Sequence, residues 1–349
     1  MTRAPGPHPL PIFLAALQAA CADDPARLAA ALTGLARYQQ APRTTPLPKR
    51  PEIARIGHVS LRGKVGPRPL VIVPSLINPP DVLDLPGRSL MAHLEAAGLS
   101  PLIVDWGDTP EPLGLSQLVS DRLAPLVGNL NQPVALMGYC LGGTLALALA
   151  GQVAATRIAL IAAPWNFAGY GEPSRAALAS WWAVAEPLAQ AMGQLPIDLL
   201  QPAFWSLDPA GLAAKYVRMA AASDNDLADF VRLEDWANGG APLSLAAAAD
   251  LAALFASSAR GLDDSAHALG ESAHELGDGA HARGESPWPP IPLLDAVALT
   301  DRIVPAAAAL TRPGDAARLE IAGGHVGMVV GRQAPSRLWP ALATFLADR

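Results

Sequence analysis

The sequence predicts an α/β fold with a mostly parallel β-sheet flanked by helices, and two observations lead to this prediction. The first is a set of short, continuous apolar runs, the pattern of strands that are buried on both faces of a sheet. These runs are PLVIVPS (69–75), SPLIVDWG (100–107), PVALMGY (133–139) and RIALIAA (157–163). The second is that helical segments alternate with the runs, as βαβ units require. These segments include GRSLMAHLEAAG (87–98), SQLVSDRLAPLVGNL (116–130) and GGTLALALAGQV (142–153).

The remaining elements extend this pattern at both ends of the chain. Residues 10–40 predict one or two helices with apolar faces, and the proline-rich run 41–51 predicts an extended linker. EIARIGHVSLR (52–62) alternates between apolar and polar residues and predicts a strand at the edge of the sheet. Two further strand candidates, IPLLDAVALTD (291–301) and ARLEIAGG (317–324), lie near the C-terminus.

The region from about 166 to 287 breaks the alternation of strands and helices. It is rich in alanine and contains several tryptophans, and it predicts a helical cap inserted between two strands of the sheet. A cap over the ends of the strands creates a pocket that is poor in water. We therefore expect four parts: a helical extension with its linker (1–50), a first core part (51–165), the cap (166–287) and a second core part (288–349).

A tandem repeat lies inside the predicted cap. The units SAHALGE, SAHELGD and GAHARGE (265–285) place His267, His274 and His281 seven residues apart. A helix would stack these histidines on one face as metal ligands, but the glycines of each unit disfavour a long helix. The histidines also lack a fixed carboxylate or cysteine partner. We favour a flexible insertion, with a metal site as the alternative.

Composition excludes several classes of protein. The 349 residues are 51% hydrophobic and 16% charged, with a net charge of −6, and they contain no basic stripe, so nucleic-acid binding has little support. No apolar run reaches the ~18 residues of a membrane helix, and the proline-interrupted N-terminus does not resemble a signal peptide. Two cysteines, Cys21 and Cys140, form no disulfide framework and suit a reducing compartment. We expect a cytoplasmic protein.

The strongest local signal is GYCLGG at 138–143. It follows the apolar run VALM and opens the helical segment TLALALA. This order matches the nucleophile elbow G-x-S-x-G, with Cys140 in place of serine, and it predicts the α/β-hydrolase fold. Small neighbours let strand and helix pass closely, and the N-terminus of the helix favours a thiolate. The alternative is a buried structural cysteine.

Chain order then predicts the partners of the nucleophile, because the acid follows it and the histidine comes last. Asp301 ends the strand candidate 291–301, where residues of a site belong, whereas its competitor Asp295 lies within that strand. His325 lies in GGHVG (323–327), directly after the last strand candidate. We expect His325 to act as the base and Asp301 to orient it. A purely structural histidine is the alternative.

Backbone N–H groups complete the predicted site. An oxyanion formed on an attacked carbonyl needs two donors, and the elbow supplies the first from Leu141. The second is expected from the loop after PLVIVPS, where Leu76 is our candidate and Ile77 the alternative.

Several segments together resemble the polyhydroxyalkanoate synthase family. They are PLVIVPSLINPPDVLDL (69–85), IVDWG (103–107), GYCLGG (138–143), DRIVP (301–305) and GGHVGMVVG (323–331). A cysteine in the elbow is typical of these synthases and uncommon among other α/β-hydrolases. The short chain looks most like the smaller synthase subunits, which act with a separate partner protein. The chain departs from the family at Ala306, where a tryptophan commonly follows the acid motif.

The resemblance implies an acyltransferase. In the family, the cysteine takes a 3-hydroxyacyl group from coenzyme A, the histidine activates the nucleophile, and the aspartate helps to activate the hydroxyl that extends the polyester. By motif, these roles fall on Cys140, His325 and Asp301. The implied partners are the hydroxyacyl-CoA substrate, the growing polyester or a granule surface, and a second copy or partner subunit. No motif suggests a metal or another cofactor.

Two other functions are compatible with the sequence. An intracellular esterase, thioesterase or polyester depolymerase would use the same triad and pass the acyl group to water. A granule-associated scaffold with a vestigial site is the third possibility, and the intact set of cysteine, aspartate and histidine argues against it.

Overall fold

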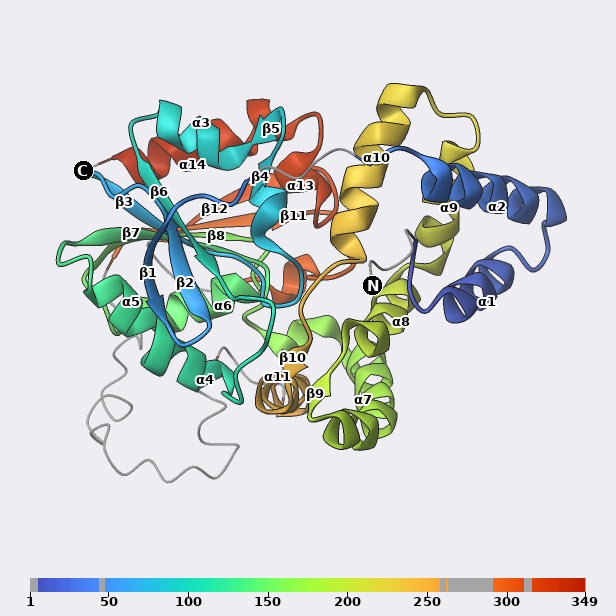
Figure 1. The fold of residues 1–349 in the computed structure, drawn as a ribbon, viewed down its shortest axis with the longest axis horizontal. Coiled ribbons are helices and arrows are strands. Elements are labelled where there is room, and N and C mark those ends of the chain that lie inside the picture. Colours follow the sequence, from blue (N-terminus) through green and yellow to red (C-terminus); the bar gives the residue numbers. More distant parts are fainter. Residues whose placement is uncertain (1–5, 44–47, 258–261, 263–290, 311–315, 349) are drawn as a thin grey trace.

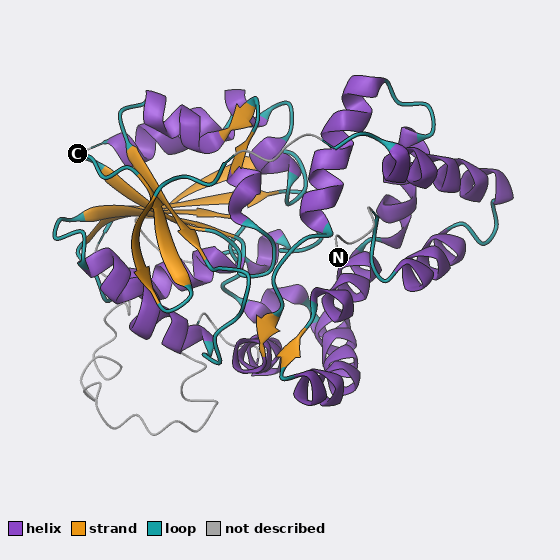
Figure 2. Cartoon of the chain, in the orientation of Figure 1, coloured by secondary structure: helices purple, strands orange, loops and turns teal. Residues whose placement is uncertain are grey.

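The computed structural model describes residues 6–43, 48–257, 262, 291–310 and 316–348. Its centre is a twisted sheet of eight strands in the order β1-β2-β6-β3-β7-β8-β11-β12 (Figures 1 and 2). The six strands from β6 to β12 are mutually parallel, whereas β1 and β2 are antiparallel at one edge. The predicted α/β class and mostly parallel sheet are confirmed. The strands are β1 (Glu52–Ile56), β2 (Val59–Gly63), β3 (Pro69–Val73), β6 (Ser100–Asp105), β7 (Val134–Tyr139), β8 (Ala155–Ile161), β11 (Leu293–Ala298) and β12 (Ala316–Ile321).

The edge of the sheet differs from the sequence prediction. Residues 52–62 form a hairpin of β1 and β2 rather than one strand. The turn falls at Gly57, whose φ of 59° is in the left-handed region that glycine adopts without a steric penalty. The continuous alternation of apolar and polar residues concealed this turn, because a tight hairpin keeps the same period on both sides.

Helices cover both faces of the sheet (Figure 1). One face packs against α3, α13 and α14, and the other against α4, α5 and α6, so that a separate apolar cluster fills each side. These helices are α3 (Leu90–Ala96), α4 (Leu115–Leu118), α5 (Ala124–Gly128), α6 (Leu141–Ala150), α13 (Gly327–Val330) and α14 (Leu338–Ala347). A π-helical turn, η2 (Val119–Leu123), joins α4 to α5, and the 3-10 turn η6 (Ala334–Ser336) precedes α14. The 3-10 turn η1 (Pro80–Leu83) and a small hairpin of β4 (Asp84–Leu85) and β5 (Arg88–Ser89) precede α3.

A second group of helices lies beside the sheet, on the right in Figure 1. It occupies the stretch between β8 and β11 that the sequence assigns to the cap, and a two-stranded sheet of β9 and β10 braces it. Its members are η3 (Phe167–Tyr170), α7 (Glu172–Met192), β9 (Gln194–Leu195), α8 (Ile197–Leu207), α9 (Pro209–Met219), α10 (Asp224–Ala237), β10 (Leu243–Ser244) and α11 (Leu245–Ser257). The histidine repeat at 265–285 lies outside the described residues.

The N-terminal helices pack on this second group and not on the sheet. Helices α1 (Leu10–Ala20) and α2 (Pro25–Gln40) share an apolar cluster with α8, α9 and α10. Its centre is aromatic: the Phe13 ring meets Trp205 and Tyr216 edge-on at 5.1 Å in both cases. The extension is therefore part of the helical layer that the cap forms. Within the described part of the chain, no helix is long and apolar enough to cross a membrane.

One carboxyl group is buried inside the sheet. Asp295, in the middle of β11, is 3% exposed, and neither of its oxygens forms a hydrogen bond of normal geometry with a described residue. Burial raises the pKa of Asp295 to about 7, although Arg318 on β12 and the backbone at Leu310 act in the opposite direction. The folded protein therefore holds this carboxyl in its neutral form up to near pH 7.

A raised pKa of an acid stabilises the folded state at low pH, and this contribution disappears as pH rises through the folded value. From Asp295 we expect the free energy of unfolding to fall between about pH 4 and pH 8, by up to about 4 kcal/mol. Asp295→Asn should flatten this dependence in urea titrations at several pH values. Glu320→Gln, which alters an exposed carboxylate on β12, is the matched control. An unchanged slope in Asp295→Asn would contradict the assignment.

Candidate active site

Cys140 is the single residue between the end of β7 and the start of α6, and its backbone conformation is strained. Its φ of 55° and ψ of −133° are unfavourable for a residue with a side chain. Two backbone hydrogen bonds hold it there: the Cys140 N–H donates to the Ile161 carbonyl at 2.9 Å, and the Gly143 N–H donates to the Cys140 carbonyl at 2.8 Å. The turn is therefore anchored to the sheet through Ile161 at the end of β8. The side chain of Cys140 remains partly exposed.

The glycines of GYCLGG are required by close packing. A Cβ atom on Gly138 would lie 2.4 Å from the Cα of Gly143, and one on Gly142 would lie 2.2 Å from the carbonyl oxygen of Val73. No side chain fits at these distances. The second contact also shows that the elbow touches the chain leaving β3, which places the loop after β3 next to Cys140.

Asp301 and His325 come together on the loops after β11 and β12. One carboxylate oxygen of Asp301 accepts the His325 Nδ1–H at 2.7 Å. The other oxygen accepts the N–H groups of Ile303 at 2.8 Å and Val304 at 2.9 Å. Both side chains are buried, at 7% exposure for His325 and 0% for Asp301. The carboxylate is thus fixed by its own loop. Because it occupies Nδ1 of His325, the other ring nitrogen, Nε2, is the one that faces Cys140.

The charges of these groups determine the protonation of the imidazole. Burial lowers the pKa of His325, but the negative charge of Cys140 and the hydrogen bonds with Asp301 and Cys140 raise it more, to about 10. The ring of His325 is therefore held in its protonated form between the side chains of Asp301 and Cys140. This arrangement can deliver a sulfur nucleophile and a proton at the same place.

Tyr139 supports the histidine from beside the elbow. Its ring stacks on His325 with centroids 5.2 Å apart, and its hydroxyl donates to the His325 carbonyl at 3.5 Å. Burial, and then the charges of Cys140 and Asp301, hold the pKa of Tyr139 well above its usual range. Sequence reasoning missed this role, although Tyr139 is the variable residue of the elbow motif.

The two backbone groups expected to bind an oxyanion are both available. The Leu141 N–H opens α6, where the first N–H groups have no partner within the helix. Among the described residues, neither the Leu141 nor the Leu76 N–H has a hydrogen-bond acceptor, whereas the Ile77 N–H is taken by Ser75 Oγ at 3.3 Å. Leu76 is therefore a better candidate than Ile77 for the second donor.

The cap anchors the loop that carries Leu76. The side-chain amide of Asn78 donates to the carbonyls of Ala237, the last residue of α10, and Gly239, just beyond it, at 3.2 Å each. In return, the Trp236 indole N–H donates to the Pro79 carbonyl at 2.7 Å. The sequence contains no spacing signal for these bonds, because they join residues more than 150 positions apart.

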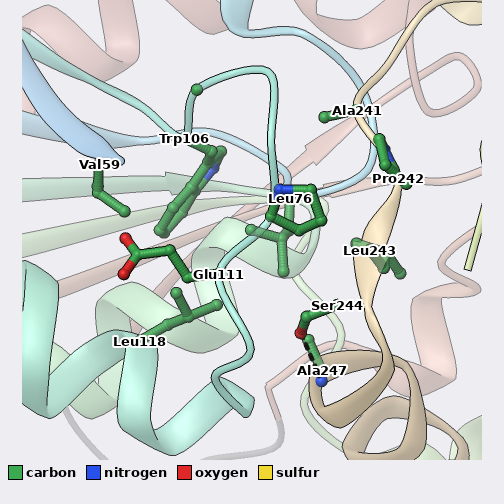
Figure 3. A pocket seen from close by; sticks show the side chains of 12 residues that line it. Val59, Leu76, Trp106, Glu111, Leu118, Ala241, Pro242, Leu243, Ser244 and Ala247 are labelled. Carbon is green, nitrogen blue, oxygen red and sulfur yellow. Dashed lines mark hydrogen bonds between the residues drawn. The ribbon is translucent and has the colours of Figure 1, made fainter. Parts of the chain in front are cut away.

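Cavities lie on both sides of this loop. A small one of about 40 Å³ borders Leu76 and Trp106 of the core and Leu243 and Ala247 of the cap (Figure 3). A larger one of about 400 Å³ lies between the linker, η1 and α10, where Arg43 and Trp236 line it. Each cationic side chain that lines it has an acidic partner. The described residues contain no cluster of histidine, cysteine and acidic side chains that would hold a metal ion.

Comparison with known proteins identifies relatives of one kind. The poly(3-hydroxyalkanoate) polymerase subunit PhaC of Haloferax mediterranei is 27% identical over 305 residues, covering 80% of this chain and 59% of that protein. The PhaC subunit of Synechocystis sp. is 30% identical over 188 residues, covering 49% of this chain and 50% of that protein. The chain is therefore similar to two polymerase subunits that are named for poly(3-hydroxyalkanoate). The chain spans about half the length of the curated relatives it matches.

The other comparisons are more distant. No family model matches the chain. A monoacylglycerol lipase from Paleococcus ferrophilus has a TM-score of 0.48 and 13% identity, covering 83% of this chain and 97% of its own. Rv0554 from Mycobacterium tuberculosis has a TM-score of 0.48 and 15% identity, covering 83% and 93%. The assignment of this chain to the α/β-hydrolase fold rests on its own strand order and elbow.

The imidazolium can be tested directly. We expect nitrogen NMR of labelled histidine to show His325 protonated at pH 8.5 in the unmodified protein. Cys140→Ala removes the negative charge beside the ring, so the pKa of His325 should fall by roughly 1 to 3 units. Cys21→Ala, which alters the buried cysteine of the N-terminal helices, should leave the His325 signal unchanged. Equal protonation in Cys140→Ala and the unmodified protein would refute the proposed pairing.

Proposed function

We propose that this protein is an acyltransferase that takes a 3-hydroxyacyl group from coenzyme A onto Cys140 and passes it to a growing polyhydroxyalkanoate chain. The observation that carries the proposal is the buried hydrogen bond from His325 to Asp301, at 2.7 Å, beside a cysteine in an elbow turn. The family relationship supports the choice of acyl donor, because both matched relatives are named as polymerase subunits for poly(3-hydroxyalkanoate).

In the first half-reaction, the Cys140 sulfur attacks the thioester carbonyl carbon of the substrate. The carbonyl oxygen becomes an oxyanion, for which the N–H groups of Leu141 and Leu76 are the proposed donors. When the intermediate collapses, the bond to the sulfur of coenzyme A breaks. His325 gives its proton to that leaving sulfur, so free coenzyme A departs and an acyl-cysteine remains.

In the second half-reaction, a hydroxyl group replaces coenzyme A as the partner of the acyl-enzyme. Now neutral, His325 accepts the hydroxyl proton, and Asp301 stabilises the imidazolium that forms. The hydroxyl oxygen attacks the acyl carbon, the carbon–sulfur bond breaks, and Cys140 is regenerated. If the acceptor is the hydroxyl end of a polyester, the chain grows by one unit. If it is water, the outcome is hydrolysis, which is the rival function.

The test is incubation with 3-hydroxybutyryl-CoA while thiol release and products are followed. We expect thiol release with formation of polyester or bound oligomers, and a loss of at least about 1,000-fold in Cys140→Ala, since the nucleophile is removed. Cys21→Ala should retain activity. Release that yields only free 3-hydroxybutyrate would establish the hydrolase instead. No release at several acyl-chain lengths, with and without a synthase partner subunit, would refute the synthase.

The anchoring of the loop after β3 gives a second prediction. Trp236→Phe keeps an aromatic ring but loses the N–H that holds the Pro79 carbonyl. One hydrogen bond contributes about 1 kcal/mol, so we expect kcat for coenzyme A release to fall roughly 5-fold if the bond positions the Leu76 N–H. Trp182→Phe in α7 is the control. Equal rates in the two variants would show that the anchor does not serve catalysis.

A further inference from the structure

The chain that leaves β8 passes between the nucleophile and the acid. In the sheet, β8 lies directly between β7, which ends at Cys140, and β11, which leads to Asp301. Residues beyond the carboxyl end of β8 therefore emerge in the gap where an acceptor hydroxyl must meet an acyl-cysteine. The segment in this position is 162–170, and the proposed mechanism has not used it.

This segment is tied to the nucleophile on one side. The Thr144 hydroxyl on α6 donates to the Pro164 carbonyl at 2.6 Å. A Cβ atom on Gly143 would lie 2.3 Å from that of Ala163, so the segment lies directly on the first turn of the nucleophile helix. Its position relative to Cys140 is therefore set by the helix that begins at the elbow.

On the other side, the same segment is tied to the loop that carries Asp301. The N–H groups of Trp165 and Asn166 both donate to the Ala308 carbonyl, at 2.8 and 3.0 Å. A Cβ atom on Gly169 would lie 2.0 Å from the Ala307 carbonyl oxygen. These contacts join the segment to the 3-10 turn η5 (Ala306–Ala308), just after the acid motif.

The segment ends at Tyr170, whose ring packs against two phenylalanines. The ring lies 4.8 Å from Phe255, edge-on, and 6.1 Å from Phe167, stacked. The other three tyrosine hydroxyls each donate a hydrogen bond, whereas the Tyr170 hydroxyl forms none with any described residue. Burial, and then the negative charges of Cys140 and Asp301, hold the pKa of Tyr170 well above its usual range. The backbone contacts of the segment place Tyr170 between the elbow helix and the loop that follows Asp301, and its phenol is neutral.

We propose that Tyr170 binds the acceptor 3-hydroxyl group and so favours polyester extension over hydrolysis, an inference that rests on the proposed acyltransferase function. The phenol donates to one lone pair of the acceptor oxygen, and the second lone pair attacks the acyl carbon. The acceptor proton passes to His325, a carbon–oxygen bond forms, the carbon–sulfur bond breaks, and Cys140 leaves as the thiolate. A water molecule makes fewer contacts with the site than the acceptor alcohol does. Water is therefore held less often in the position from which it could attack the acyl-cysteine.

The test is Tyr170→Phe, which removes one oxygen atom and keeps the aromatic packing. Coenzyme A release in the first turnover should stay within about 2-fold of the unmodified protein, because Tyr170 does not act in that half-reaction. The ratio of free 3-hydroxybutyrate to ester products should rise about 5-fold, the effect of one hydrogen bond. Tyr216→Phe, whose hydroxyl bonds to Glu234 in the helical layer, should leave the ratio unchanged.

Methyl 3-hydroxybutyrate, supplied as a soluble acceptor in competition with water, gives the same ratio without polymer. An unchanged ratio in Tyr170→Phe, or an equal slowing of both half-reactions, would overturn the proposal for Tyr170. Absence of Cys140-dependent coenzyme A release in the unmodified protein would instead refute the proposed function itself. The two failures are therefore distinguishable.

Discussion

The strained turn at Cys140 is the constraint on which the rest of the site depends. The turn brings β7, α6 and the chain leaving β3 within backbone contact, and a Cβ atom at Gly142 would overlap the Val73 carbonyl at 2.2 Å. Because this approach leaves no room for side chains, it also keeps the chain that leads from β3 to Leu76 beside the elbow. The sheet holds the strain through the hydrogen bond from Cys140 to Ile161.

The charges around His325 are the second requirement of the site. Taking an imidazolium out of water is costly, and the charges of Asp301 and Cys140 outweigh that cost at His325, whose pKa rises to about 10. Asp295, within β11, is the opposite case: it is buried without a compensating cation in hydrogen-bond contact, and its pKa rises toward neutrality. Two aspartates six residues apart thus differ in their surroundings, because the carboxylate of Asp301 accepts hydrogen bonds from His325, Ile303 and Val304.

The sequence predicted the parts of this arrangement that are local. Apolar runs located the parallel strands, and the elbow motif with chain order singled out Cys140, Asp301 and His325, which the structure brings to one end of the sheet. The turn at Gly57 was missed because its pattern does not change period. The bonds from Trp236 and Asn78, and the placement of Tyr170 between two strand ends, depend on which strands are neighbours. A sequence without the strand order does not contain that information.

The most direct test of the account is to identify the acylated residue. Protein mixed with 3-hydroxybutyryl-CoA and quenched in acid within one turnover should carry one hydroxybutyryl group on the peptide that contains Cys140. Cys21→Ala should carry the same group on the same peptide, because Cys21 is buried among the N-terminal helices. An acyl group on another residue, or coenzyme A release without acylation of Cys140 in either protein, would contradict the covalent mechanism and the role of the elbow.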